Sequence, residues 1–579
     1  MIGNSNTALA RASALLLAFW LVALVFLTWP LSYSPNGEPS DDILKRLSRV
    51  VSELDSLKQQ NQELRVIVSN ITQSGLQINE EVVSNFKHKL KGLTMKGSKS
   101  NGQHSPSKQF ELSRRQVDQG IQEMGFYLKS ELEKLKKVLV EKGETSLTKK
   151  IGDIIQGQVE HERVLGFDLE EMSNQDGLDD WRAAEALALS HLVQKRLHWL
   201  QNPKDCSTAR KLLCNLNKGC GYGCQIHHAA YCFILAYSTK RTLILQSKKW
   251  RYHRGGWEEI FMPLSETCLS SSGRNLKKWP GTNDTQVIEL PIVDMLSPRP
   301  PHLPLAIPKD ISERLMRLHG DPSVWWIGQF MKYLLRYQPD TQKFVDEAGA
   351  NFGFQKPIVG IHVRRTDKVG TEAAFHSIEE YMVHVQEYYE RLELKQGSKV
   401  EHRRVYLASD DASVLPEARK KYPNYTFLGD PSIASNAGVA TRYSDSSLRG
   451  IIIDIHFLAH SDYLVCTFSS QVCRVAYEIM QTIHPDASSW FRSLDDIYYY
   501  GGQNAHKEVA IFPHTARNDA EISLEKGDVI GIMGNHWDGF SRGTNERTKK
   551  QGLYPSFKTK NKLEIVDFPS YLEADTQDS

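Results

Sequence analysis

The sequence predicts an α/β protein with parallel sheets, and three patterns support this fold class. The largely apolar run Ile358–Val363 ends on Arg364 and Arg365, which is typical of a buried parallel strand whose carboxyl end reaches solvent. Strand-like segments at 241–245, 405–409 and 462–467 alternate with helix-like ones. Ser469 and Ser470 then open a helical pattern directly after the last of these strands. Since open α/β sheets bind ligands at the carboxyl ends of their strands, we expect a binding site at this edge.

The first predicted element is a membrane anchor at residues 12–31, which contain no charged side chain. Arg11 precedes this segment, and acidic residues follow it, so we expect residues 1–11 in the cytosol and the remainder in a lumen. A cleaved signal peptide is the alternative, although no small-residue cleavage site follows the run. The acceptor tripeptides at Asn70, Asn283 and Asn424 fit a lumenal chain.

Residues 32–108 are predicted to form a stem. Apolar residues alternate by three and four over 43–71, with Asn61 at one core position, which indicates a parallel two-stranded coiled coil and hence a homodimer. The alternative is an amphipathic helix that packs on its own domain. A basic linker follows and leads into a helical region at 109–205. Its first helix, over 109–141, extends the dimer interface or packs on the catalytic domain.

Charge and cysteine usage bound the class of protein. The formal charge is +2 with 24% charged residues, which gives no reason to expect a nucleic-acid partner. Six of the eight cysteines lie within 206–268, which suggests disulfides in an oxidising compartment. Zinc is the alternative, because Cys220, Cys224, His227 and His228 are possible ligands. Spacing alone does not decide the pairing.

Two blocks carry a family resemblance. The segments 362–376 and 215–228 resemble the α-1,6-fucosyltransferases that add core fucose to N-glycans, and similar stretches cover most of residues 109–564. The resemblance implies a Golgi enzyme with a GT-B-like fold, in which a catalytic domain at 206–494 contains two Rossmann-type halves. It also implies the disulfides Cys206–Cys268, Cys214–Cys232, Cys220–Cys224 and Cys466–Cys473.

Residues 503–564 resemble a Src-homology-3 (SH3) barrel and are followed by a tail at 565–579. The matching segments are 509–512, 521–530, 536–540 and 552–556. Trp537 stands alone where two aromatic residues are common, which speaks against a proline-rich peptide ligand. The segment Pro298–Pro304 is either an internal ligand for the barrel or, as we favour, a rigid connection.

The expected donor site binds a diphosphate without a metal or cofactor. The chain has no Asp-x-Asp tripeptide, so Arg364 and Arg365 are the expected clamp for the leaving group. The helix that begins near Ser470 offers free N–H groups to the same phosphates. The alternatives are a surface arginine pair and an ordinary helix cap. The resemblance implies further donor contacts: His362 and Asp454 to the base, Tyr252 and Asp410 to the ribose, Ser470 to phosphate, and Gly221 and Cys224 to the nucleotide. For Asp454 the alternative is an ion pair with Arg449.

The acceptor hydroxyl needs a base, for which Glu372 is the best candidate, and Lys368 holds or relays charge. The alternative is an ordinary surface ion pair. The resemblance also implies acceptor contacts by Asp294, Asp495, Asp496 and His536.

The sequence therefore predicts an inverting, metal-independent transferase that moves fucose from GDP-fucose to the 6-hydroxyl of the innermost N-glycan GlcNAc. One alternative is a related enzyme that fucosylates chitooligosaccharide or a protein hydroxyl. Another is a membrane-anchored SH3 adaptor with an inactive transferase fold.

Overall fold

A computed structural model describes residues 105–366, 374–438, 441–535 and 537–576. The predicted membrane anchor at 12–31, the coiled coil at 43–71 and most of the linker lie outside these ranges. Within the described ranges, no helix combines the length and apolar character that a membrane span requires.

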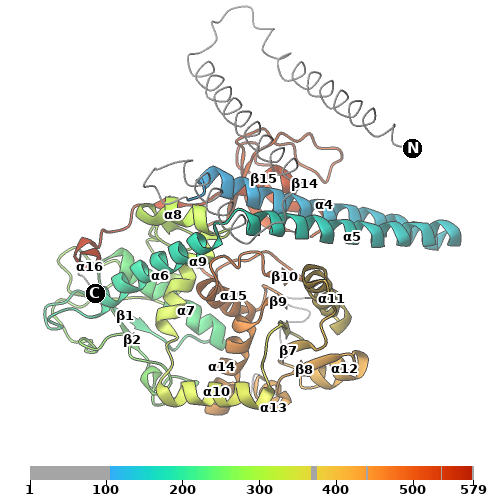
Figure 1. The fold of residues 1–579 in the computed structure, drawn as a ribbon. Helices are drawn as coiled ribbons and strands as arrows, with labels where there is room; N and C mark the ends of the chain where they lie inside the picture. Colours follow the sequence, from blue (N-terminus) through green and yellow to red (C-terminus); the bar gives the residue numbers. More distant parts are fainter. Residues whose placement is uncertain (1–104, 367–373, 439–440, 536, 577–579) are drawn as a thin grey trace, which may run out of the picture. The chain divides into compact units, whose positions relative to one another are not determined.

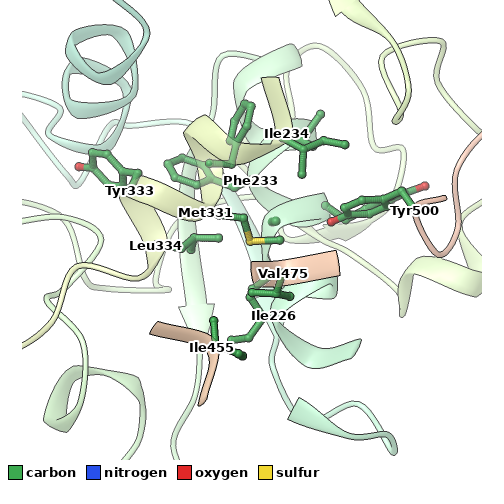
Figure 2. Packing of buried hydrophobic residues seen from close by; sticks show 14 of the residues in the cluster. Ile226, Phe233, Ile234, Met331, Tyr333, Leu334, Ile455, Val475 and Tyr500 are labelled. Carbon is green, nitrogen blue, oxygen red and sulfur yellow. The ribbon is translucent and has the colours of Figure 1, made fainter. Parts of the chain in front are cut away.

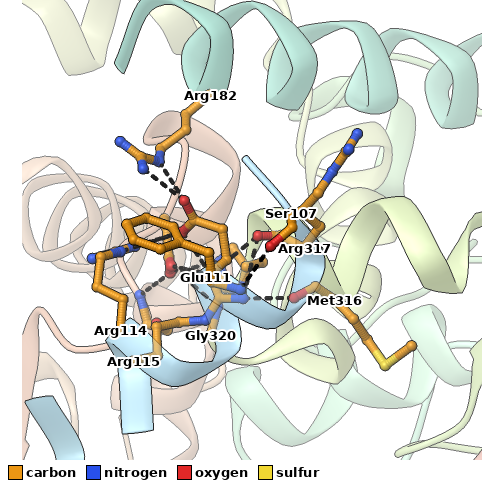
Figure 3. Close-up of polar contacts among 12 residues, drawn as sticks. Ser107, Glu111, Arg114, Arg115, Arg182, Met316, Arg317 and Gly320 are labelled. Carbon is orange, nitrogen blue, oxygen red and sulfur yellow. Dashed lines mark hydrogen bonds and ion pairs between the residues drawn. The ribbon is translucent and has the colours of Figure 1, made fainter. Parts of the chain in front are cut away.

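Long helices precede the sheets. α4 (Lys108–Glu141) and α5 (Thr145–Gln175) form a hairpin, and α6 (Asp179–Gln201) follows (Figure 1). The predicted helix at 109–141 is therefore present as α4. Figure 3 shows how its first turns are held: buried Glu111 accepts from Arg182 of α6 at 2.6 Å, and Arg115 donates to the backbone oxygen of Met316 at 2.5 Å. These contacts fix the start of α4 to the catalytic domain.

The N-terminal half of the catalytic domain is built on a four-stranded parallel sheet. Its strand order is β2 (Thr242–Gln246), β1 (Lys211–Asn215), β4 (Val287–Glu289) and β3 (Lys277–Lys278). The helices of this part are α7 (Tyr222–Ser238), α8 (Lys309–Leu318), α9 (Pro322–Leu334) and α10 (Pro339–Phe352). Short 3₁₀ turns occur at Trp257–Glu259 and Val293–Met295. The helix α7 is buried along its whole length, as its apolar sequence requires.

The C-terminal half contains a five-stranded parallel sheet. Its order is β10 (Phe491–Ser493), β9 (Tyr463–Cys466), β6 (Ile358–Val363), β7 (Arg403–Ser409) and β8 (Tyr425–Leu428). The helices are α11 (Ile378–Gln396), α12 (Val414–Lys421), α13 (Pro431–Asn436), α14 (Asp445–His460) and α15 (Gln471–Ile483). All residues of β6 are buried, as predicted for a central parallel strand. The predicted strands near 241, 405 and 462 correspond to β2, β7 and β9.

A large apolar core joins the two halves. Side chains of α7, α9, α14 and α15 interlock there, among them Ile226, Phe233, Met331, Ile455 and Val475 (Figure 2). Close crossing of α9 and α15 depends on Gly328, where a Cβ atom would lie 2.5 Å from the backbone oxygen of Glu478. A second core lies under α11 and α12 on the C-terminal sheet. The halves are thus packed through helices, and we call the region around the carboxyl ends of β6 and β7 and the N-termini of α7 and α15 the cleft.

The SH3-like barrel follows the catalytic domain. Its antiparallel sheet has the order β14 (Gln551–Pro555), β13 (Phe540–Asn545), β12 (Val529–Asn535), β11 (Lys507–Ala510) and β15 (Thr559–Asn561). A 3₁₀ turn at Ser556–Lys558 precedes β15. Within the SH3-like segment 521–530, only Val529 and Ile530 belong to a strand, and residues 521–528 form bridges and turns with Gly527 at positive φ.

The chain then returns to the catalytic domain. β16 (Ile565–Val566) pairs with β5 (Ile307–Pro308), and α16 (Leu572–Asp575) packs on α6. Tyr571 is fully buried and donates its hydroxyl hydrogen to the backbone oxygen of Tyr237 at 2.6 Å. The barrel is therefore anchored to the catalytic domain at both of its ends.

Candidate functional site

The carboxyl end of β6 places the two predicted arginines in different surroundings. Arg364 lies 3.3 Å from Asp410, measured from Nε to Oδ2, and its side chain is 17% exposed. Arg365 is directed toward α12, where its Nη1 pairs with Glu417 at 2.7 Å, and its guanidinium stacks on Phe375 at 5.0 Å. The predicted double clamp is thus asymmetric in this structure: Arg365 supports the sheet edge, and Arg364 faces the groups described next.

Asp410 organises the turn after β6. Its carboxylate accepts hydrogen bonds from the backbone N–H of Arg365 at 2.8 Å and of Thr366 at 3.1 Å, and from the hydroxyl of Thr366. Asp410 itself is buried at the end of β7. It therefore holds the chain immediately before the segment that carries Lys368 and Glu372. Those two residues and the neighbouring Asp367 lie outside the described residues, as does His536.

His362 and Asp454 are buried polar groups that suit recognition of a base. Burial, and then the charge of Arg364, lowers the pKa of His362 to about 4, so its imidazole is neutral near pH 7. Its Nδ1 has no hydrogen-bond partner among the described residues. Burial raises the pKa of Asp454 to about 7, and its Oδ1 accepts from the hydroxyl of Tyr406 at 2.8 Å. The alternative partner Arg449 instead stacks on Phe344 at 5.1 Å.

The N-terminal half supplies the opposite side of the cleft. Tyr252 is buried against Tyr222 and Tyr443, with ring centroids at 5.7 and 5.2 Å. Burial raises its pKa to about 12, so the hydroxyl stays a neutral hydrogen-bond donor. Arg364 and Arg442 both lower this pKa electrostatically, which shows that the two guanidiniums lie within electrostatic reach of Tyr252. Tyr252 thus shares its surroundings with cations from the C-terminal half.

Arg442 was not among the residues predicted from the sequence. Its Nη1 lies 3.8 Å from the position that a Cβ atom on Gly221 would occupy, and the hydroxyl of neighbouring Tyr443 donates to the backbone oxygen of Cys220 at 3.3 Å. These residues precede α14, and their sequence offers no strand end or paired arginine that would have marked them. Their contacts with the cysteine loop indicate a second cation beside the cleft.

Two helix N-termini meet in the cleft. α7 begins after Gly221 and α15 begins after Ser470, so each presents free backbone N–H groups. A Cβ atom on Gly223 would lie 2.9 Å from the Cβ of Gln471, so only glycine allows this approach. His227 also contacts Gln471, with Nδ1 3.0 Å from Oε1. Converging helix N-termini with a nearby arginine are suited to binding a diphosphate.

All four disulfides implied by the resemblance are present. They join Cys206–Cys268, Cys214–Cys232, Cys220–Cys224 and Cys466–Cys473. The zinc alternative at Cys220 and Cys224 is wrong, because bonded sulfurs are not the thiolates that zinc needs. His228 also lies close to Cys214 and Cys232, whose sulfurs are likewise bonded to each other. Cys220–Cys224 instead braces the loop that begins α7.

The predicted acceptor residues have different environments. The side chain of Asp294 is 59% exposed and pairs with Lys218 at 2.6 Å, which leaves it accessible. Asp495 is engaged with its own protein: its Oδ1 accepts from the backbone N–H of Phe468 at 2.8 Å and from the hydroxyl of Ser493 at 3.0 Å. Asp496 accepts from the N–H of the next residue at 2.8 Å. The structure therefore gives Asp495 a role in holding the chain before α15.

The two parallel sheets and the helices packed between them define a glycosyltransferase fold of the GT-B-like kind, with two Rossmann-type halves. Residues 3–499 match the family model described as alpha-(1,6)-fucosyltransferase N- and catalytic domains, and residues 510–560 match a variant SH3 domain. The chain belongs to the alpha-(1,6)-fucosyltransferase family.

Curated relatives cover nearly the whole chain. An alpha-(1,6)-fucosyltransferase of Drosophila melanogaster is 47% identical, and the match spans 99% of this chain and 98% of the relative. One from Caenorhabditis elegans is 38% identical, over 96% and 98% respectively. Among solved structures, the fucosyltransferase NodZ from Bradyrhizobium matches at 13% identity with a TM-score of 0.28, covering 47% of this chain and 92% of that one.

Proposed function

We propose that this protein transfers L-fucose from GDP-fucose, with inversion, to the 6-hydroxyl of the innermost GlcNAc of N-glycans. The observation that carries the proposal is the 47% and 38% identity to alpha-(1,6)-fucosyltransferases over nearly the whole chain. Arg364 and the N-termini of α7 and α15 are suited to the same function. The neutral imidazole of His362 and the carboxylate of Asp454 face the base. The adjacent N1–H and N2–H donors of guanine suit a single ionised carboxylate.

The leaving group is GDP, whose departure needs positive charge near its phosphates. Arg364, Arg442 and the N-terminus of α15 supply that charge from the protein itself. We therefore propose a transfer that requires no metal, in line with the absence of an Asp-x-Asp tripeptide from the sequence. EDTA should leave the rate unchanged. A strict dependence on Mn²⁺ would overturn this part of the proposal.

Glu372 is proposed to accept the acceptor proton, with Lys368 beside it. The segment that carries both is held at each side: Asp410 binds the backbone of Thr366 before it, and Arg365 stacks on Phe375 after it. A Ser377–Glu380 capping box then starts α11. Asp294, Asp495, Asp496 and His536 are proposed to contact the glycan.

We further propose a single-pass Golgi membrane protein with a lumenal catalytic domain. The four disulfides support an oxidising compartment. A second copy of this chain is the proposed occupant of the exposed apolar residues of α4 and α5, which include Val117, Met124, Leu128, Leu135, Val164 and Met172. Sedimentation of the lumenal chain tests this, and a monomer at micromolar concentration would contradict it.

One assay tests the central proposal against its rivals. Purified protein is given GDP-fucose with a biantennary N-glycan, a free chitin oligomer or a peptide hydroxyl. We expect transfer to the N-glycan and release of GDP. Transfer to the chitin oligomer or peptide alone would support a different acceptor class. Absence of GDP binding by calorimetry would favour the alternative of an SH3 adaptor with an inactive transferase fold.

A further inference from the structure

One contact between the barrel and the catalytic domain is made by a tryptophan. The indole Nε1–H of Trp537 donates to the backbone oxygen of Asp495 at 2.8 Å. Trp537 has a φ of +54°, and its own N–H donates to the side chain of Asn535 at 2.7 Å. A tryptophan in the left-handed region costs free energy, and persists where its surroundings over-determine it. The conformation of the barrel therefore fixes the direction in which the Trp537 indole points.

The helix α4 and strand β10 close around the same ring. Phe126 of α4 meets Trp537 edge to face, with centroids 5.9 Å apart at 82°. The guanidinium of Arg492 lies 4.0 Å from the Phe126 ring and 5.2 Å from that of Trp537. Arg492 is half-buried between the two rings, and burial lowers its pKa. We call Phe126, Arg492 and Trp537 the barrel joint.

The barrel joint uses the face of the barrel that bears Trp537. The neighbouring Gly539 lies so close to α4 that a Cβ atom there would be 2.7 Å from the Cβ of Tyr127. A cavity of about 2310 Å³ runs beside the joint, and the residues that line it include Arg492 and Trp537 but not Arg364, Asp410 or Asp454. The occupant of this face is thus the chain's own helix, at a place separate from the donor cleft.

Asp495 connects the barrel joint to the donor cleft. While its backbone oxygen accepts from Trp537, its carboxylate accepts from the N–H groups of Phe468 and Ser469, at 2.8 and 3.3 Å. Ser469 immediately precedes Ser470, the cap residue of α15. A displacement of Asp495 therefore moves the backbone that leads into the helix N-terminus.

We propose that Trp537 and Arg492 are positioning residues for the donor diphosphate, acting through Asp495 on the start of α15. The barrel supports transfer in this way, in addition to the proposed acceptor contact by His536. This inference rests on the proposed GDP-fucose site. It gives the SH3-like fold an internal partner, formed by α4 and β10, in place of a proline-rich peptide.

The test measures GDP binding by calorimetry on the complete lumenal chain. Trp537→Phe keeps an aromatic ring and removes the N–H donor, and we expect GDP affinity to fall about three- to tenfold, which is the range of a single hydrogen bond. Arg492→Lys keeps the charge but loses the planar stack on the aromatic rings, and it should also lower GDP affinity. The matched control is Trp279→Phe, which removes an indole bond to the oxygen of Pro298 at 2.9 Å in the N-terminal half. It should leave GDP affinity unchanged.

A double-mutant cycle separates positioning from general loss of stability. In Asp495→Asn the link to Phe468 is weakened, so adding Trp537→Phe should cost little further GDP affinity. Fully additive losses would overturn the proposal. So would normal GDP binding in both Trp537→Phe and Arg492→Lys with only a lower melting temperature. If the unmodified protein fails to bind GDP, the proposed donor site is wrong. That result differs from the two outcomes that would overturn only the positioning role of Trp537 and Arg492.

Discussion

The two halves of the catalytic domain contribute to the cleft by different means. The N-terminal half supplies mainly backbone, in a loop braced by Cys220–Cys224 that starts α7. The C-terminal half supplies side chains at its strand ends, namely His362, Arg364 and Asp410. Three of the four disulfides lie in residues 206–268. They hold the backbone shape of a segment that has no charged motif. In the proposed site, the N-terminal half therefore contributes mainly backbone groups, and the C-terminal half contributes charged and titratable side chains.

The largest expected effect tests the chemistry of the C-terminal half. Glu372→Gln keeps the size of the side chain but removes the basic carboxylate. We expect kcat to fall about 10²–10⁴-fold, the usual contribution of a general base, while GDP affinity measured by calorimetry changes little. Loss of GDP binding would show that Glu372 is structural. Near-normal turnover would move the role of base to Asp367 or another carboxylate.

The two arginines after β6 allow a comparison within the C-terminal half. Arg364→Lys should lower kcat/KM about 10- to 100-fold, since it removes charged hydrogen bonds of about 1.5–3 kcal/mol. Arg365→Lys should cost less, because Arg365 already pairs with Glu417 and stacks on Phe375. Steady-state kinetics of both variants provide the measurement. Equal losses would mean that Arg365 leaves Glu417 when substrate binds.

GDP binding should depend on pH through Asp454. Its pKa is about 7 in the folded protein, above the ordinary value of 3.8, because it is buried. Ionised Asp454 is the form that accepts from guanine, so GDP affinity should fall as pH drops below 7, up to about tenfold per unit. Calorimetry between pH 5.5 and 8, in steps of about half a unit, measures this. An Asp454→Asn variant with the same pH profile would assign the effect to another group.

The raised pKa of Asp454 also predicts how the stability of the ligand-free protein changes with pH. Because the folded pKa of Asp454 is raised, its stabilising contribution is complete below about pH 4 and is lost as pH rises through about 7. Between those values Asp454→Asn should therefore lose less stability with rising pH than the unmodified protein. Urea unfolding at matched pH values tests it. Parallel pH profiles of the two proteins would contradict the assignment.

The smallest expected effect concerns the braced loop of the N-terminal half. Replacing Cys220 and Cys224 together by serine frees the loop but leaves its N–H groups in place. We expect GDP affinity to fall only a few-fold, because the ordering cost of a short loop is modest. The Cys206→Ser, Cys268→Ser double variant is the control. A loss as large as that of Arg364→Lys would contradict the division of roles between the halves.

Sequence patterns predicted the features that are local in the chain. The end of β6 was marked by its apolar run and paired arginines, and α15 by Ser469 and Ser470. Both depend on residues within a few positions of each other, so pattern and structure agree. The disulfide pairs came from the family resemblance, since spacing alone left the pairing open.

Features that depend on distant contacts were missed. Arg365 pairs with Glu417, which is 52 positions away, and nothing near either residue announces that pair. Arg442 reaches the cysteine loop from the other half of the domain. Asp495, predicted to contact the acceptor, also binds backbone N–H groups 26 and 27 positions away through its carboxylate. Such roles become visible only after the chain has folded.

The return of the chain after the barrel has a consequence for how the barrel joint can be built. Pairing of β16 with β5 and burial of Tyr571 tether the barrel at its far end, while β10 precedes it closely at the near end. A module tethered twice faces its partner surface at a high effective concentration, so weak contacts are enough to keep it docked. The barrel joint therefore does not need the area of an independent protein interface, and truncation before Tyr571 would weaken it without touching any of its residues.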